Sequence, residues 1–233
     1  MNSNHFIGHF LAQTDTVGLV LALILLAMSL ASWTYIVGKS LQLWSDFRRG
    51  NASEAAFWSA PSIAAVTHRF TQSAPRDPMA RLASDALRAQ GRVQGLSAHT
   101  LAQAGTPAEW LTRQLRRSID HETTRLEGGL TLLSSVAAVA PFVGLFGTVW
   151  GVYHALSAIG GGAGASLEQI AGPVGEALVM TGFGLAVAIP AVLAYNAFSR
   201  ANRVLLNRLD GHAHDLLHVL TTGLPVQTAA GGV

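Results

Sequence analysis

Three long stretches with almost no charged residue constrain this chain more than any other feature of its sequence. They cover residues 16–38, 128–167 and 170–199, and Glu176 is the one charged residue within them. A helix needs about 20 apolar residues to cross a bilayer, so each stretch is long enough to span it. Only 12% of the residues are charged, against about 25% in an ordinary soluble protein. The pattern predicts an all-α membrane protein with three transmembrane helices at 16–38, 128–156 and 170–199.

The basic residues predict how these helices are oriented. Residues 1–15 and the loop at 157–169 contain no Lys or Arg, whereas residues 39–127 contain 12 and the tail at 200–233 contains three. Because Lys and Arg in short loops resist translocation, the basic segments should remain in the cytoplasm. We therefore expect the N-terminus and the 157–169 loop to face outward, and the 39–127 segment and the tail to face inward.

The segment between the first two spans carries signals for helix starts. Ser53 and Thr106 precede helix-forming runs as N-cap residues, Asp77 precedes a proline at the first helical position, and Glu109 completes a capping box with Thr106. Nothing between Glu109 and Leu126 breaks the last of these helices, so it is expected to run into the second span and to end near residue 156. Leucines at helical spacing continue the third helix to about residue 223. Two spans should thus extend into long cytoplasmic helices.

Several function classes lack support in the sequence. The chain contains no cysteine, which excludes disulfides and thiolate chemistry. No phosphate-binding glycine loop or hydrolase motif is present, so neither an enzyme nor a cofactor is predicted. His214 and His218 have a spacing that can bind a metal, with His212 nearby, but a solvated helix explains them better. Six arginines are assigned to anionic phospholipid or partner contacts rather than to nucleic acid: Arg113, Arg116, Arg117, Arg125, Arg200 and Arg203.

Two motifs in the second and third spans resemble a known family. The first reads APFVGLFGTVWG at residues 140–151, and the second reads AGPVGEAL at residues 171–178. Together they closely resemble the ExbB/TolQ/MotA family of proton channels, densely over residues 128–200 and more loosely elsewhere. Within the family, the third span favours the ExbB type. A TolQ-type subunit, which serves envelope maintenance in the Tol-Pal system, is the alternative, and a non-conducting membrane scaffold is a third reading.

The resemblance implies both an assembly and an activity. An ExbB-type protein is a pentameric channel subunit of the bacterial inner membrane that encloses the single transmembrane helices of a partner, ExbD. It uses the proton gradient to drive TonB, which opens outer-membrane receptors for iron chelates and vitamin B12. The N-terminus would then be periplasmic and the C-terminus cytoplasmic.

Glu176 is the candidate proton-pathway residue. A carboxylate within a span costs about 2.5 to 3.5 kcal/mol on insertion scales, so such residues usually face a bundle interior or a water-filled cavity. The alternative is a structural acid near the outer interface. Thr148 and Thr181 are predicted to line the pore with Glu176 because the resemblance implies it. From the residues alone, bonding to their own helix carbonyls or to a neighbouring helix explains these threonines better.

Small residues and prolines in the spans are assigned structural roles. Glycines at helical spacing allow close helix packing, and the expected set is Gly144, Gly147, Gly151 and Gly184. Pro141 and Pro190 each remove a helix hydrogen bond and should bend their spans.

Overall fold

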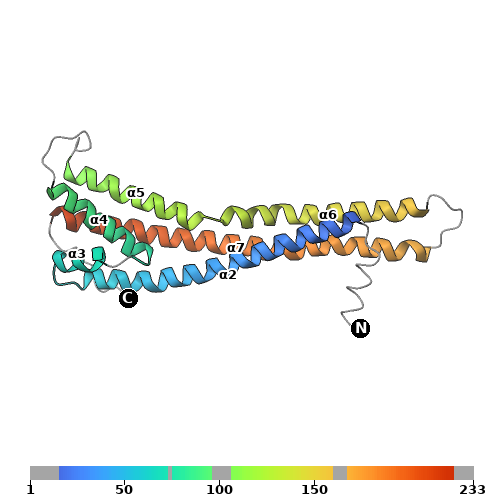
Figure 1. The fold of residues 1–233 in the computed structure, drawn as a ribbon, viewed down its shortest axis with the longest axis horizontal. Helices are drawn as coiled ribbons and strands as arrows, with labels where there is room; N and C mark the ends of the chain where they lie inside the picture. The colour runs from blue at the N-terminus through green and yellow to red at the C-terminus, as the bar shows by residue number, and fades with distance from the viewer. Residues whose placement is uncertain (1–15, 73–74, 96–105, 160–166, 223–233) are drawn as a thin grey trace, which may run out of the picture. The chain divides into compact units, whose positions relative to one another are not determined.

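The computed structural model describes residues 16–72, 75–95, 106–159 and 167–222, and the regular structure of these residues is entirely helical (Figure 1). Three of the helices are long and apolar enough to cross a membrane. The prediction of an all-α chain with three helices suited to membrane spans is therefore confirmed. The helices are α2 (Thr16–Trp58), α3 (Ile63–Gln72), α4 (Pro78–Gly95), α5 (Pro107–Glu127), α6 (Leu130–Ile159) and α7 (Leu167–Thr222).

The chain divides into two compact units, and the division follows the charge pattern of the sequence. The apolar unit comprises Met1–Lys39 and Gly129–Phe198, and the polar unit comprises Ser40–Gly128 and Ser199–Val233. Helices α2 and α7 each contribute residues to both units. The boundaries at residues 39, 129 and 198 lie within one or two residues of the predicted ends of the apolar segments.

The apolar unit leaves large hydrophobic side chains uncovered. Phe142 and Val149 on α6 are 70% and 60% exposed, and Leu193 on α7 is 63% exposed. Water would penalise such a surface by about 25 cal/mol for each Å² of apolar area. This surface is suited to lipid or to other apolar helices, as a membrane protein requires.

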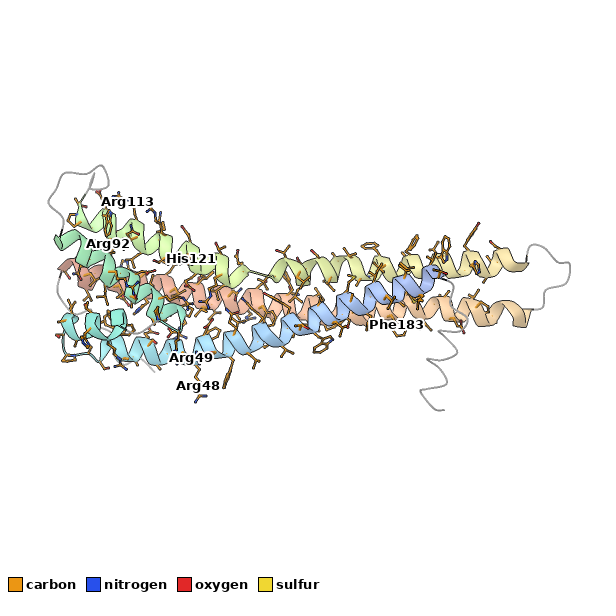
Figure 2. The ribbon with its side chains drawn as sticks, viewed as in Figure 1. Arg48, Arg49, Arg92, Arg113, His121 and Phe183 are labelled. Atoms are coloured by element: carbon orange, nitrogen blue, oxygen red, sulfur yellow. The ribbon has the colours of Figure 1, made fainter. Side chains whose placement is uncertain are left out.

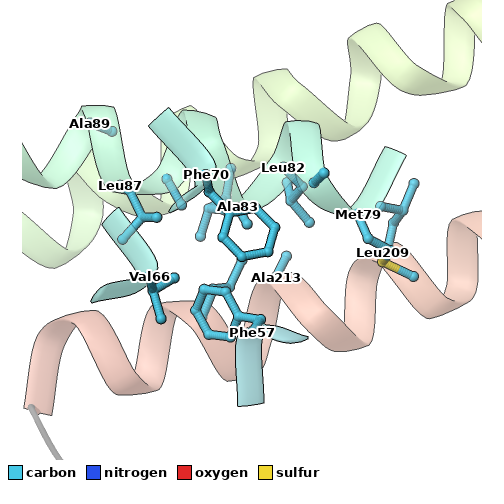
Figure 3. Close-up of a cluster of buried hydrophobic side chains, with 14 of the residues drawn as sticks. Phe57, Val66, Phe70, Met79, Leu82, Ala83, Leu87, Ala89, Leu209 and Ala213 are labelled. Carbon is cyan, nitrogen blue, oxygen red and sulfur yellow. The ribbon is translucent and has the colours of Figure 1, made fainter. Parts of the chain in front are cut away.

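The polar unit has a hydrophobic core of its own. Phe57 at the end of α2 meets Phe70 of α3 with ring centroids 5.9 Å apart, and α4 supplies Leu82, which is 1% exposed (Figure 3). Leu209 and Leu216 of α7 are completely buried in the same cluster. The predicted continuation of the third helix, with leucines at helical spacing, is thus confirmed to Thr222.

Two of the three predicted helix starts are confirmed, and the third is wrong. The Asp77 side chain accepts a hydrogen bond from the Ala80 amide at the start of α4, and Thr106 and Glu109 form the predicted capping box of α5. Ser53, in contrast, lies inside α2, which continues to Trp58. Its hydroxyl donates to Asp77, 2.7 Å away, and therefore bonds to another element instead of capping a helix.

The expected uninterrupted helix from Pro107 through the second span is also wrong at one point. Helix α5 ends at Glu127 and α6 begins at Leu130, and Gly129 between them has a φ of 80°. This left-handed conformation favours glycine, and a Cβ atom there would also collide with the ring of Tyr35. The pair Gly128 and Gly129 separates the two helices.

Several boundary predictions are only partly covered by the structure. Helix α6 continues to Ile159, three residues past the predicted end of the second span, and α7 begins at Leu167. Most of the predicted loop at 157–169 and the N-terminal segment 1–15 lie outside the described residues. Pro141 is inside α6 and Pro190 inside α7, together with Pro173, which we did not single out. Bending at these prolines stays a prediction.

Candidate functional site

Helices α6 and α7 approach each other closely through their small residues. A Cβ atom built on Gly144 would lie 2.6 Å from the carbonyl oxygen of Met180, and one built on Gly184 would lie 2.6 Å from that of Ala140. A Cβ atom built on Gly151 would lie 2.7 Å from the Cβ atom of Ala177. Side chains of ordinary size do not fit at these positions, so the backbones of the two helices are in near contact.

These contacts fix the antiparallel register of the two helices. Gly147 lies against the side chain of Met180, one helical turn from the contact of Gly151 with Ala177. Thr148, next to Gly147, and Glu176, next to Ala177, are consequently about one turn apart along the hairpin, or about 5 Å. The register brings these two predicted site residues to neighbouring levels.

The two threonines have different environments. Thr148 is 7% exposed, and its hydroxyl donates to the carbonyl oxygen of Leu145 in its own helix at 2.7 Å. Thr181 is half-buried, and its hydroxyl makes no hydrogen bond with other described residues. Thr148 therefore has the intrahelical bond that its residue type favours, whereas the Thr181 hydroxyl remains available to another group.

Glu176 is the one acidic residue of α7 between Ile170 and Phe198, and it is half-buried. It shares one face of α7 with Phe183, labelled in Figure 2, because seven residues complete about two helical turns. Thr181, five residues away, points about 140° around the helix from Glu176. Glu176 and Thr181 thus flank the α7 stripe that packs on α6, one on each side, instead of sharing one face.

Ser32 is a buried polar residue that the sequence analysis did not single out. It lies on α2 in the apolar unit, is 1% exposed, and its hydroxyl has no hydrogen-bond partner among the described residues. Leaving a hydroxyl unpaired in an apolar environment costs about 1 to 3 kcal/mol. In the sequence, Ser32 stands out only as a serine inside a largely apolar run. Such serines are common in transmembrane helices that use them only for packing, so the pattern does not predict an unpaired hydroxyl.

The polar unit contains a buried ion-pair network. Arg81 on α4 binds Glu122 on α5 through two guanidinium nitrogens, one of them at 2.7 Å, and Arg125 lies 3.8 Å from the same carboxylate. Asp46 on α2 is 4% exposed, and burial raises its pKa although the charges of Arg81 and Arg125 lower it in part. The network therefore holds the Glu122 carboxylate in a salt bridge, and burial raises the pKa of the nearby Asp46 carboxyl.

The six arginines predicted to contact lipid or partners are all exposed on the polar unit. Figure 2 marks Arg113 on α5. Arg125 takes part in the ion-pair network, and its side chain is 45% exposed. The others lie on α5 and on the continuation of α7: Arg116, Arg117, Arg200 and Arg203. Their exposure leaves them accessible, and their role as lipid or partner contacts stays a prediction.

The histidines of α7 differ from one another. His214 and His218 are exposed, as expected of a solvated helix, but His212 is 4% exposed. Its ring meets Phe57 and Trp58 edge-on, with centroids 5.5 and 5.9 Å away, and burial lowers its pKa. Within the described ranges, no group of three potential ligands is arranged to hold a metal ion.

Known proteins resemble this chain over most of its length. Residues 75–211 match the MotA/TolQ/ExbB proton channel family. The chain is 40% identical to the biopolymer transport protein ExbB of Xanthomonas campestris pv. campestris over 89% of its own length and 83% of the relative's. It is also 40% identical to ExbB of Neisseria meningitidis, over 87% of this chain and 91% of that one. The Tol-Pal system protein TolQ of Haemophilus influenzae is 32% identical over 86% and 87% of the two chains.

Proposed function

The chain belongs to the MotA/TolQ/ExbB proton channel family, and from this membership we propose that it is an ExbB-type subunit of an inner-membrane energy-transducing complex. In this role it uses the proton motive force to drive a TonB-type protein and hence uptake of iron chelates or vitamin B12 across the outer membrane. The observation that carries the proposal is the position of Glu176, a carboxylate within an apolar segment of α7, in a member of this family.

Sequence similarity supports the ExbB branch of the family more than the TolQ branch. Identity is 40% to the ExbB relatives given above and 32% to the TolQ relative, over similar lengths. This difference favours the ExbB branch. A TolQ-type function in envelope maintenance is the second candidate, since that relative aligns over nearly the whole chain as well.

We propose that five copies assemble around a common axis and enclose the single transmembrane helix of an ExbD-like partner. The support is the composition of the apolar unit, which combines exposed apolar side chains such as Phe142 and Leu193 with the half-buried Glu176 and Thr181. Lipid tolerates the first two but penalises an ionised carboxylate. Association around an axis keeps the polar groups away from lipid.

In the proposed mechanism, Glu176, Thr148 and Thr181 contribute to a polar lining that faces an acid of the partner helix. Each proton that crosses the membrane releases about 2.3 kcal/mol for every 100 mV of potential. Protonation of the partner acid removes its charge, and its helix then shifts or rotates against the lining. Because the transfer is coupled to this movement, the subunit alone should not conduct protons freely.

The proposed topology follows the distribution of basic residues. The N-terminus lies in the periplasm, and the polar unit, with Arg113, Arg117 and Arg200 among its exposed arginines, lies in the cytoplasm. There the arginines attract anionic phospholipid. Reconstitution in neutral lipid should then lower the stability of the assembly, and identical melting with and without anionic lipid would contradict this part of the proposal.

Complementation distinguishes the two branches and the scaffold. The chain is expressed in one bacterial strain that lacks its ExbB and in another that lacks its TolQ, together with the single-span protein encoded beside it. An ExbB-type subunit restores iron-chelate uptake in the first strain and leaves the envelope defect of the second. The reverse pattern would assign the chain to the TolQ branch, and failure in both, with the chain assembled in the membrane, would favour a scaffold.

A further inference from the structure

An open cavity of about 380 Å³ lies in the polar unit, outside the site described above. Helix α2 forms one side, the end of α3 another, and the entry to α4 the third. Its volume is within the range of pockets that bind small organic molecules. Three arginines and one aspartate line it together with apolar side chains: Arg49, Ala52, Ser53, Ala56, Arg69, Phe70, Arg76, Asp77 and Ala80.

The carboxylate of Asp77, the one acidic residue that lines this cavity, already accepts two hydrogen bonds. Asp77 is 3% exposed, and its two carboxylate oxygens accept hydrogen bonds from the Ala80 amide at 3.0 Å and from the Ser53 hydroxyl at 2.7 Å. One of these bonds caps helix α4, and the other ties α4 to α2. Asp77 thus has a structural role that uses both of its oxygens.

The three arginines that line the cavity, in contrast, form no ion pairs with described residues. Arg49, which Figure 2 marks on α2, is exposed, as are Arg69 and Arg76. None of the three takes part in an ion pair with another described residue, although other arginines of this unit, Arg81 and Arg208, do. Three guanidinium groups, from α2, α3 and the segment before α4, therefore surround one cavity, and none of them forms an ion pair with a described residue.

We propose that this cavity binds the phosphate group of a phosphate monoester. Three arginines and one aspartate give the lining a net charge of +2, and a phosphate monoester carries about −1.5 to −2 at pH 7. Guanidinium groups bind phosphate oxygens in a bidentate manner, which favours arginine over lysine for this purpose. Ala52, Ala56 and Phe70 provide an apolar wall for the organic part of the ligand.

The test is a titration of the full-length protein, in a neutral detergent, with inorganic phosphate and with glycerol 1-phosphate, followed by ³¹P NMR line broadening. Saturable binding is expected. The substitution pair Arg69→Gln and Arg76→Gln should weaken it by more than about ten-fold, because it removes charged hydrogen-bond donors. The matched pair Arg88→Gln and Arg92→Gln removes equal charge from exposed positions of α4 outside the cavity, and it should change the affinity by less than about two-fold.

Several results of these measurements would contradict the proposal. If vesicles of phosphatidylglycerol, but not of phosphatidylcholine, displace glycerol 1-phosphate from the wild type, the cavity binds the phosphodiester of a lipid headgroup, and the monoester proposal is overturned. Absence of saturable binding to the wild type, or equal weakening by both substitution pairs, would overturn the proposal. It would also be overturned if the wild type does not bind phosphate and native mass spectrometry shows that only the Arg69 and Arg76 pair dissociates the assembly, because the cavity would then be a contact between copies.

Discussion

Gly144 of α6 and Gly184 of α7 face each other so closely that a Cβ atom built on either one would lie 3.1 Å from the Cα atom of the other. The same added atoms would lie 2.6 Å from a backbone carbonyl oxygen of the opposite helix. Backbone atoms cannot move aside as a flexible side chain does. This contact therefore sets both the spacing and the register of the hairpin that carries Thr148 and Glu176.

Substitution of Gly144 by alanine should force α6 and α7 apart. The expected cost is about 1 to 3 kcal/mol, as for other overpacked contacts. Gly182→Ala is the matched control, because an added Cβ there would meet nothing within 4 Å. The thermal unfolding midpoint in detergent should fall for Gly144→Ala and stay near the wild-type value for Gly182→Ala, and an equal effect of both would contradict the packing described here.

Loss of Arg81 should destabilise the polar unit because it leaves Glu122 buried without its main partner. The Glu122 side chain is 4% exposed, and breaking a buried pair from one side costs about 3 to 5 kcal/mol. Arg81→Met should therefore lower the unfolding midpoint strongly, whereas Arg88→Met, at an exposed position of the same helix, should have little effect. Restored stability in Arg81→Met with Glu122→Gln would identify the unpaired charge as the cause.

Burial of His212 makes the stability of the polar unit depend on pH. Its pKa lies below the ordinary value of about 6.5, so the folded state binds a proton less readily than the unfolded state. The stabilisation is complete above that value and is lost as the pH falls below it, by at most about 1.4 kcal/mol for each pH unit. Nearby acids, Glu54, Asp215 and Asp77, oppose the shift only in part.

The measurement compares unfolding midpoints between about pH 8 and pH 5, a range that brackets the ordinary histidine pKa. His212→Gln should lose stability less steeply with acid than the wild type, while His214→Gln, which replaces an exposed histidine, should follow the wild-type curve. Asp46 changes stability in the opposite sense, since its pKa is raised, and it is present in all three proteins. Identical pH dependence of the three would show that His212 does not titrate as described.

Features that depend on neighbouring residues were predictable from the sequence. The stretches almost without charged residues predicted the apolar segments. The caps at Asp77 and Thr106 were predictable because each forms a hydrogen bond with an amide only three residues away. The capping signal at Ser53 failed because the partner of its hydroxyl lies 24 residues away. A local pattern does not distinguish a serine that caps its own helix from one that binds a distant aspartate.

Features that depend on tertiary packing were less predictable. The glycine pair at residues 128 and 129 is visible in the sequence, but its effect requires Tyr35 beside it and a left-handed backbone. Burial of His212 likewise depends on two aromatic rings from α2. For the candidate site, the sequence predicts Glu176, Thr148 and Thr181, and their role stays a prediction. The placement of Glu176 and Thr181 on opposite sides of the packed stripe depends on the register of α7 with α6, which the sequence does not show.

The threonine hydroxyls are predicted to support function together. Thr148→Val and Thr181→Val keep the side-chain shape and remove one hydroxyl each. Because Thr148 bonds to Leu145 in its own helix, its replacement alone should be mild, and that of Thr181 alone should also be partial. Uptake of an iron chelate should fall severely only in the double variant, and a fully active double variant with normal assembly would remove both residues from the lining.

Glu176 is proposed to carry the proton-linked function, and iron-chelate uptake by cells whose only copy of this subunit has Glu176→Ala tests this role directly. We expect uptake at the level of cells without the subunit, with native mass spectrometry showing an unchanged assembly, and normal uptake for the control Glu127→Ala, which replaces an exposed acid outside the spans. Glu176→Gln should be as inactive as Glu176→Ala, because it keeps hydrogen bonding but removes the charge. Wild-type uptake by an assembled Glu176→Ala complex would show that Glu176 does not carry the proton-linked function.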